Sequence, residues 1–474
     1  MLIDNNWVNS NNTFDVINPY TTEIIDSVPI ASEVNISNAL KFSYNFNCRL
    51  SGTDRAAILK RTAEAIERHK YDMAILITRE SGLCIKNALY EVERAINCVN
   101  LSAIQAELID KIDLTPEFVT HYDPSVPKLT VISEPWDLAV GITPFNHPLN
   151  LVVHKVAPAI AAGTAIVLKP SEKTPLTALK LGEILVENGL PANMLNIVTG
   201  IPPKNIVDQL ITFPKIDLVS FTGGVDTGKY IIKKMVNHGN ELKKFIPELG
   251  GNSAFVIMDD ADIDLAAKTA LSAFENSGQR CTSIKKILLH DDIAYDFIER
   301  FLKLTEEIKC GDPMDPEIDM GSVISEDAAI LIHTRVNRSI EEGGKLIIGN
   351  ERQGALFSPT IIDRVDPSDE LVVKETFGPV APIIRIKSID DAIEIIKSGQ
   401  FRLAGAIATR DREKALRLQN SICTGQFSWN GPPGYRTEEA PFGGFGDSGN
   451  GEKEGVIMTV RSMRRIRTFY EHRM

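Results

Sequence analysis

The feature that most constrains the fold of this 474-residue chain is an alternation of short apolar segments with helical patterns, which begins near residue 138. LAVGITPF at 138–145, TAIVLKPS at 164–171 and IDLVSFTGG at 216–224 are predicted to be buried strands, and the segments between them have helical spacing. Such alternation is typical of βαβ units, so it predicts an α/β fold with a parallel sheet. Because ligands bind beyond the carboxyl ends of such strands, we expect this half to bind a nucleotide.

A second alternation begins after Gly251 and runs to about residue 445 without a linker. It includes a helix predicted over 262–280 and another over 293–307. The first 110 residues carry helical patterns over roughly 54–70 and 87–109. At about 150 residues per domain, this length predicts roughly three lobes.

Two segments read as strands outside these domains. LTVIS, within the proline-containing stretch 113–135, is predicted to be an exposed strand of an arm, and RRIRTFYEH near the C-terminus alternates like an edge strand.

Charge and cysteine usage exclude several classes of protein. The net charge of -12 argues against a nucleic-acid or anionic-membrane partner, because phosphate neutralisation needs clustered Lys and Arg. No signal peptide and no transmembrane run is visible. The six cysteines are scattered without a CxxC pair, which indicates reduced thiols rather than disulfides or a metal site. We therefore expect a cytoplasmic enzyme.

Three residues are candidates for catalysis, each with an ordinary alternative. Cys281 in GQRCTS lies between a helical pattern and a strand, where a loop can present a thiol, although most free cysteines are inert core residues. Glu248 in PELGGNS is either a general base or a salt-bridge partner. Asn146 in TPFNHP is either an amide donor to an oxyanion or a simple turn or N-cap residue.

Candidates for nucleotide binding also follow predicted strands. Lys169 and Glu172 in LKPSEKTP suit nucleotide hydroxyls or phosphate, but a solvated ion pair is equally ordinary. FTGGVDTG at 221–228 is a glycine-rich turn into a helix, consistent with a cofactor at a helix N-terminus. GFGDSG at 444–449 matches GxGxxG literally but follows a loop, so we interpret it as a false positive.

Taken together, TPFNHP, LKPSEKTP, FTGG, ELGGNS, GQRC, ETFGPV and PFGG, in this order and spacing, closely resemble the aldehyde dehydrogenase superfamily. The resemblance covers nearly the whole chain and implies that family's fold. It implies an NAD-binding domain of the Rossmann type (1–116 and 136–249) and an α/β catalytic domain (250–446). A small β oligomerisation arm with a C-terminal strand (117–135 and 447–474) would build a homodimer or homotetramer.

The resemblance also implies roles for individual residues. Cys281 would attack the aldehyde as a thiolate, the Asn146 amide and the Cys281 backbone N–H would hold the oxyanion, and Glu248 would activate water to hydrolyse a thioester. The residues implied for cofactor binding are Thr143, Phe145, Lys169, Glu172, Gly223, Gly224, Gly228, Glu375 and Phe377.

Within that set, Lys169 and Glu172 would contact the adenosine ribose, Glu375 the nicotinamide ribose, and Phe377 the nicotinamide ring. A carboxylate at Glu172 should repel a 2′-phosphate, which favours NAD over NADP. Gly224 stands where Ser or Thr usually follows FTG, so the pyrophosphate contact there differs from the common pattern.

For the substrate, GDPMDPEIDMGSVI, GALFSPT and PGYRTEEAPFGG look most like phosphonoacetaldehyde dehydrogenase and its phosphonoformaldehyde-oxidising relatives. His147, Arg280 and Arg436 would bind an anionic tail, because guanidinium forks match phosphonates. The alternative is that both arginines pair with carboxylates such as Glu438 or Glu439.

Other functions remain open at this point. Lactaldehyde and glyceraldehyde 3-phosphate are alternative substrates. Glu248 argues against the CoA-acylating branch, whose members generally lack that glutamate. A catalytically silent binding protein on the same fold is a further alternative, although Cys281, Asn146 and Glu248 are all present.

Overall fold

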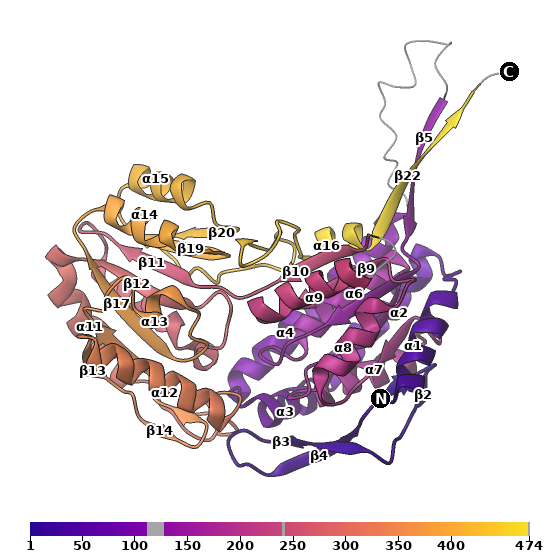
Figure 1. Cartoon of the computed structure of the whole chain (residues 1–474), viewed down its shortest axis with the longest axis horizontal. Helices are drawn as coiled ribbons and strands as arrows, with labels where there is room; N and C mark the ends of the chain where they lie inside the picture. Colours follow the sequence, from indigo (N-terminus) through magenta and orange to yellow (C-terminus); the bar gives the residue numbers. More distant parts are fainter. Residues whose placement is uncertain (111–127, 239–241, 473–474) are drawn as a thin grey trace.

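The computed structural model describes residues 1–110, 128–238 and 242–472. Its described parts form two lobes, each built on a seven-stranded sheet, and a two-stranded arm that projects from one lobe (Figure 1). The predicted α/β fold class is confirmed. No helix among the described residues is long and apolar enough to cross a membrane.

The first sheet has the strand order β10-β9-β6-β7-β8-β1-β2, with β10 to β8 parallel and β1 antiparallel to β8. Its strands are β1 (Leu2–Ile3), β2 (Asn6–Trp7), β6 (Leu138–Ile142), β7 (Ala165–Lys169), β8 (Leu195–Ile197), β9 (Leu218–Thr222) and β10 (Lys244–Glu248). A hairpin of β3 (Thr13–Ile17) and β4 (Ile24–Pro29) lies beside this lobe. The helices of this part are α1 (Glu33–Asn45), α2 (Gly52–Arg68), α3 (Lys70–Ser81), α4 (Ile85–Ile109), α6 (Asn150–Ala162), α7 (Leu176–Glu187), α8 (Pro203–Thr212) and α9 (Val225–His238).

Helices cover both faces of this sheet, which explains the continuous apolar runs in the sequence. In β7, Ile166 and Leu168 pack into one core and Val167 into the other, because successive side chains of a strand point to opposite faces. Every residue of β7 is therefore buried.

The second sheet has the order β13-β16-β17-β12-β11-β19-β20. Its strands are β11 (Ser253–Ile257), β12 (Ile284–His290), β13 (Lys345–Ile348), β16 (Thr360–Asp363), β17 (Val380–Ile386), β19 (Ala404–Ala408) and β20 (Gln426–Trp429). Its helices are α10 (Ile263–Ala270), α11 (Ala294–Glu306), α12 (Glu326–Glu341), α13 (Glu370–Val373), α14 (Ile389–Ser398) and α15 (Arg412–Ile422). Short pairs join β14 (Arg352–Gln353) to β15 (Leu356–Phe357) and β18 (Phe401–Arg402) to β21 (Phe445–Gly446).

The chain returns to the first lobe at its C-terminal end. Helix α16 (Val456–Ser462) packs against α6 and α4, and β22 (Arg464–Glu471) then pairs antiparallel with β5 (Lys128–Pro135) to form the arm. The Arg464 guanidinium fixes the base of the arm, since it donates to Ala162 and Ser133 carbonyls and to Asp110. Residues 117–127 of the predicted arm lie outside the described residues.

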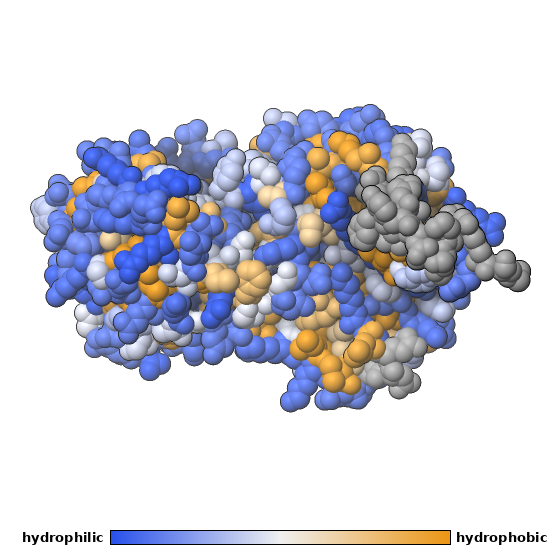
Figure 2. All heavy atoms as spheres, turned by 90° about the horizontal axis from the view of Figure 1, so that it is seen from above, coloured by the Kyte–Doolittle hydropathy of each residue, from blue (hydrophilic) through white to orange (hydrophobic). Residues whose placement is uncertain are grey.

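The surface differs between the lobes. Seen from above, hydrophobic side chains gather mainly over the lobe that carries the arm, and a narrower waist joins it to the other lobe (Figure 2). On the arm itself, Ile466, Phe469 and Tyr470 are exposed. The exact residues at which the three domains were predicted to begin and end stay a prediction, because the membership of strands in a sheet does not define a domain boundary.

The helix predicted over 262–280 is wrong. Helix α10 ends at Ala270, and two 3-10 turns follow, η1 (Leu271–Ala273) and η2 (Glu275–Gly278). Asn276, Ser277 and Gly278 have φ between 53° and 69°, a left-handed conformation that a right-handed helix cannot contain. The chain reverses there and brings Cys281 to the junction of the sheets.

This turn generates a prediction about stability. A Cβ at Gly278 would lie 2.0 Å from the Gly378 carbonyl oxygen, so Gly278→Ala combines left-handed strain with a steric clash. We expect a loss of about 2–4 kcal/mol in unfolding free energy. Gly354→Ala is the matched control, since its φ is also positive but its Cβ meets nothing within 4 Å; we expect it to cost only about 1–2 kcal/mol. Urea unfolding measures both, and equal midpoints would contradict the prediction.

Candidate active site

The candidate site lies where the carboxyl ends of the first sheet meet the amino ends of the second. Asn146, Lys169 and Glu248 follow or end β6, β7 and β10, whereas Cys281 and Glu375 precede β12 and β17. A cavity of about 360 Å³ at this junction is lined by Phe145, Asn146, Gly223, Gly224, Gly250, Gln279, Cys281, Glu375, Phe377 and neighbouring residues. Most of the cofactor and catalytic residues that the sequence predicted therefore lie around one cavity in the structure.

Cys281 is held on a loop that touches its neighbours through backbone atoms. A Cβ at Gly251 would lie 2.0 Å from the Cys281 carbonyl oxygen, so only glycine permits this approach. Asn146 Nδ2 donates a hydrogen bond of 2.9 Å to the Gln279 carbonyl, which places the amide beside the thiol. Burial, and then the carboxylates of Glu375 and Glu248, raise the pKa of the Cys281 thiol to about 11.

Glu248 is a buried carboxyl group without a hydrogen-bond partner among the described residues. It is 3% exposed, and both of its oxygens lack a partner. Burial and the nearby Glu454 carboxylate raise the pKa of Glu248 well above its ordinary value. Glu454 itself is paired with the fully buried Lys155, whose Nζ donates at 2.7 Å to Glu454 and also to Ser220.

A second cavity, of about 60 Å³, is also lined by Cys281. His147, Arg280 and Arg436 all line it together with Asn146, Glu248 and Cys281, so the three residues predicted to bind a substrate anion converge. Asn276 Nδ2 contacts His147 Nε2 at 2.9 Å, and His147 Nδ1 has no partner among the described residues. Burial, followed by Arg280 and Arg94, lowers the pKa of His147 to about 3, so this imidazole is neutral.

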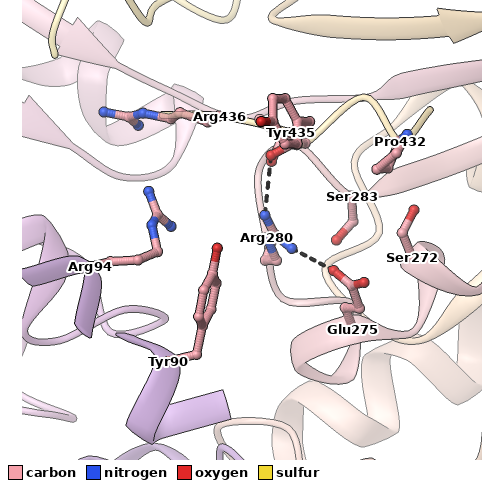
Figure 3. Close-up of a pocket in the computed structure, with 11 residues that line it drawn as sticks. Tyr90, Arg94, Ser272, Glu275, Arg280, Ser283, Pro432, Tyr435 and Arg436 are labelled. Atoms are coloured by element: carbon pink, nitrogen blue, oxygen red, sulfur yellow. Dashed lines mark hydrogen bonds and ion pairs between the residues drawn. The ribbon is translucent and has the colours of Figure 1, made fainter. Parts of the chain in front are cut away.

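Arg94, Arg280 and Arg436 line this cavity and also a neighbouring cavity of about 230 Å³, which Figure 3 shows, and they differ in their partners. Arg280 Nη1 donates to Glu275 at 2.6 Å, and Arg94 Nε on α4 donates to Glu438 at 2.6 Å. Arg436 stacks over the Phe442 ring at 4.1 Å, and its Nε and Nη2 atoms are buried without a partner in the described part of the chain. The alternative that the arginines pair with carboxylates therefore holds for Arg280, although its partner is Glu275 and not Glu438 or Glu439, and no such pair is formed by Arg436 within the described residues.

The remaining cofactor candidates fall into two groups. Glu375 Oε1 accepts the Gly251 N–H at 2.9 Å, and Phe377 packs edge-on against Phe145 with centroids 5.9 Å apart, so these groups line the first cavity. Lys169 Nζ and Glu172 form an ion pair of 3.0 Å, and Glu172 faces a separate cleft of about 520 Å³.

The last two candidates do not belong to the lining of the first cavity. Thr143 is buried, with a hydroxyl that lacks a partner among the described residues. Gly228 lies within α9, where a Cβ would meet Leu249 at 2.5 Å, so its role in the structure is close packing of that helix.

Sequence reasoning missed several residues of the site. Arg94 and Tyr90 reach a cavity of about 230 Å³ beside Arg280 and Arg436 from helix α4, nearly 190 positions before Cys281. Both residues lie on an ordinary helix, and the sequence around them contains no motif that indicates a binding site. The only usable signal was a pair of basic and aromatic residues one turn apart, which most surface helices also show.

The chain is similar to known proteins in sequence and in fold. The family model described as "Aldehyde dehydrogenase family" matches residues 7–469. A lactaldehyde dehydrogenase of Methanococcus vannielii is 34% identical over the full length of both chains. A sulfoacetaldehyde dehydrogenase of Neptuniibacter caesariensis is 32% identical, covering 96% of this chain and 99% of that protein.

Solved structures agree with these matches. An NADP-dependent glyceraldehyde-3-phosphate dehydrogenase of Bacillus halodurans superposes with a TM-score of 0.94 at 30% identity, covering 99% of this chain and 98% of that one. These relatives are named for lactaldehyde, sulfoacetaldehyde and glyceraldehyde 3-phosphate, whereas the motifs suggested phosphonoacetaldehyde. The match over nearly the whole chain, and the site that it contains, show that this protein is a member of the aldehyde dehydrogenase family, an oxidoreductase that acts on aldehydes with NAD or NADP.

Proposed function

We propose that this enzyme oxidises a short aldehyde with an anionic tail to its carboxylic acid, with NAD as cofactor and through a thioester on Cys281. The observation that carries the proposal is Arg436, whose buried guanidinium nitrogens lack a partner among the described residues and lie at the cavity that contains Cys281. An unpaired buried cation is costly, so a bound anion is its natural complement.

The residues present fit a nicotinamide dinucleotide. Gly223, Gly224 and Gly250 line the larger cavity, and a Cβ at Gly224 would meet nothing within 4 Å, so backbone there faces open space. The Thr222 hydroxyl is buried without a partner in the described residues and is available to a polar ligand. When bound, the nicotinamide would accept the hydride that converts the thiohemiacetal on Cys281 into a thioester.

The residues of the chain would carry the other steps. The Cys281 thiolate would form a bond to the aldehyde carbon, and the carbonyl electron pair would move to the oxygen. One N–H of the Asn146 amide is used by the Gln279 carbonyl, which leaves the second N–H to donate to that oxyanion together with the Cys281 backbone N–H.

Glu248 would then act as the general base. As a carboxylate it would take a proton from water, the hydroxide would attack the thioester carbon, and the Cys281 thiolate would leave. Because its pKa is raised by burial and by Glu454, Glu248 ionises only at higher pH than an exposed glutamate. A base with a raised pKa accepts protons more strongly, which suits water activation.

The cofactor preference is part of the proposal. Glu172 keeps a lowered pKa, because Lys169 offsets its partial burial, and is therefore ionised at neutral pH. If the adenosine ribose lies against this ion pair, a 2′-phosphate would be repelled, so we favour NAD over NADP. The exposed apolar residues of β22 support assembly of the arm into a homodimer or homotetramer; sedimentation equilibrium would measure this.

Several substrates share the proposed class. Phosphonoacetaldehyde and phosphonoformaldehyde follow from the sequence motifs, whereas relatives are named for sulfoacetaldehyde, 3-sulfolactaldehyde and glyceraldehyde 3-phosphate. Lactaldehyde, for which another relative is named, has no anionic tail and is the second candidate. The arginines favour the anionic aldehydes.

A comparison of substrates tests the proposed anion site. With NAD, we expect kcat/KM for sulfoacetaldehyde or phosphonoacetaldehyde to exceed that for propanal by about a hundredfold, and NADP to be the poorer cofactor. Arg436→Ala should lower kcat/KM for the anionic aldehydes about a hundredfold and for propanal less than tenfold. Arg338→Ala, at an exposed surface ion pair with Glu342, is the control and should change neither. Equal kcat/KM for propanal and for the anionic aldehydes would contradict the anion site.

The second prediction separates the two half-reactions. Glu248→Gln removes the base but keeps the shape of the side chain, so we expect the pre-steady-state burst of NADH to remain while steady-state turnover falls by about 10²–10⁴. In the wild type, deacylation should accelerate as pH rises through the raised pKa of Glu248, because only the carboxylate form accepts a proton from water. Stopped-flow fluorescence of NADH measures both phases. Loss of the burst itself would place Glu248 in acylation instead.

The third prediction concerns the thiol of the enzyme without cofactor. Since its pKa is about 11, the thiolate fraction of Cys281 is small at neutral pH and grows about tenfold per pH unit. The rate of alkylation by iodoacetamide, followed by mass spectrometry of the Cys281 peptide, should therefore rise without a plateau from pH 7 to pH 10. A plateau below pH 8 would show that the thiolate is already formed.

A further inference from the structure

We infer that the anion site of this enzyme holds at most a single uncompensated positive charge, and that it therefore selects a monoanionic tail, a sulfonate, over a dianionic phosphonate or phosphate. This inference rests on the proposed function, since it names the substrate class of the same site. It follows from the pairing of the charged side chains that surround the cavities beside Cys281.

The charge of Arg94 is already balanced inside the protein. Its Nε donates to Glu438 Oε1 at 2.6 Å, and the second oxygen of this carboxylate contacts His154 Nε2. Glu438 is 2% exposed, and the hydrogen bond from His154 and the nearby Arg94 lower its pKa to about 2 despite its burial. Arg94 thus offers hydrogen-bond donors to a ligand but adds little net charge.

Arg280 is paired with Glu275, whose side chain is 54% exposed, in contrast to the buried Glu438. Arg280 Nη1 donates to the Glu275 carboxylate at 2.6 Å, and its Nη2 donates to the Gly434 carbonyl at 3.4 Å. Figure 3 shows Arg280 between Glu275 on one side and the loop of Tyr435 on the other, with Arg94 and Arg436 farther across the pocket.

Arg436 differs from both. The structure gives it no carboxylate partner within the described residues, and its aliphatic and guanidinium groups instead lie over the face of Phe442. Burial lowers its pKa, but an arginine remains protonated at physiological pH. Arg436 therefore carries the unmatched charge.

The other ionisable groups around these cavities add no positive charge to the sum. Glu454 is paired with Lys155, and His147 is neutral. Glu91 accepts the backbone N–H groups of Leu149 and Asn150, and burial raises its pKa to about 7, so any ionisation there would subtract from the positive charge. Burial also keeps Glu248 protonated below its raised pKa.

Net charge is the property that distinguishes otherwise similar tails. Sulfonate and phosphonate are both tetrahedral groups with three oxygens, so a cavity lined by arginines cannot distinguish them by shape. A sulfonate carries one negative charge throughout the physiological range, whereas a phosphoryl group loses a second proton near pH 6. The second charge of a dianion would be buried without a counter-charge, which is unfavourable because burial removes the charge from water.

The test is the ratio of kcat/KM for sulfoacetaldehyde to that for phosphonoacetaldehyde between pH 6 and pH 9. Because both aldehydes use the same thiol and base, their titration cancels in the ratio. We expect the ratio to be at least tenfold at pH 8.5 and to fall steadily as the pH approaches 6, where about half of the phosphonate is a monoanion. A ratio at or below one at pH 8.5, or a ratio independent of pH, overturns the inference.

A variant tests the cause. Glu275→Gln removes the partner of Arg280 without changing its size, which leaves a second uncompensated charge. We expect the ratio at pH 8.5 to shift about tenfold in favour of phosphonoacetaldehyde, whereas Asp264→Asn, which removes the carboxylate of a remote surface pair with Arg300, should leave it unchanged. No shift with Glu275→Gln, in a variant with the wild-type melting temperature, overturns the charge argument.

The same assay separates this inference from the proposed function. If neither anionic aldehyde is oxidised faster than propanal, the anion site itself is wrong. If both are faster than propanal but phosphonoacetaldehyde is preferred at pH 8.5, the proposed function stands and the single-charge inference fails.

Discussion

The position of Cys281 depends on two places where backbone approaches backbone more closely than any side chain would allow. Gly251, at the crossing from the first sheet to the second, lies against the Cys281 carbonyl, and Gly278 lies against the Gly378 carbonyl. These contacts tie together the strand end at Glu248, the cysteine loop and the loop that carries Glu375 and Phe377. Because backbone contacts cannot be relaxed by a rotamer change, they set the geometry of the junction for every side chain around it.

Electrostatics impose the second constraint. Much of the site is closed to water, so charges must be paired, neutralised or supplied with a ligand. Lys155 is paired with Glu454 and Arg94 with Glu438, and His147 is neutral. The groups left without partners among the described residues, Glu248 and Arg436, face the cavities beside Cys281. Unsatisfied polar groups in a folded protein are expected where a reaction or a ligand supplies what is missing.

Much of the fold could be predicted from periodicity. Strands buried on both faces give apolar runs, so β6, β7 and β9 were found close to their actual limits. The continuous helix over 262–280 was wrong because tertiary contacts override local helical spacing at Asn276–Gly278. Helices α1 and α3 were not predicted, since their hydrophobic faces are interrupted by polar residues.

By itself, the sequence determined the class of the enzyme and the candidates Cys281, Glu248 and Asn146, because these residues sit in local motifs at the ends of predictable strands. It also suggested that His147, Arg280 and Arg436 serve a common purpose. Only the tertiary structure decided that they line one cavity, that Arg94 joins them from a distant helix, and that Arg280 is paired with Glu275 while Arg436 is not. The physical reason is that the sequence gives the chemical type of each residue, whereas burial and charge pairing depend on contacts between residues that are far apart in the sequence.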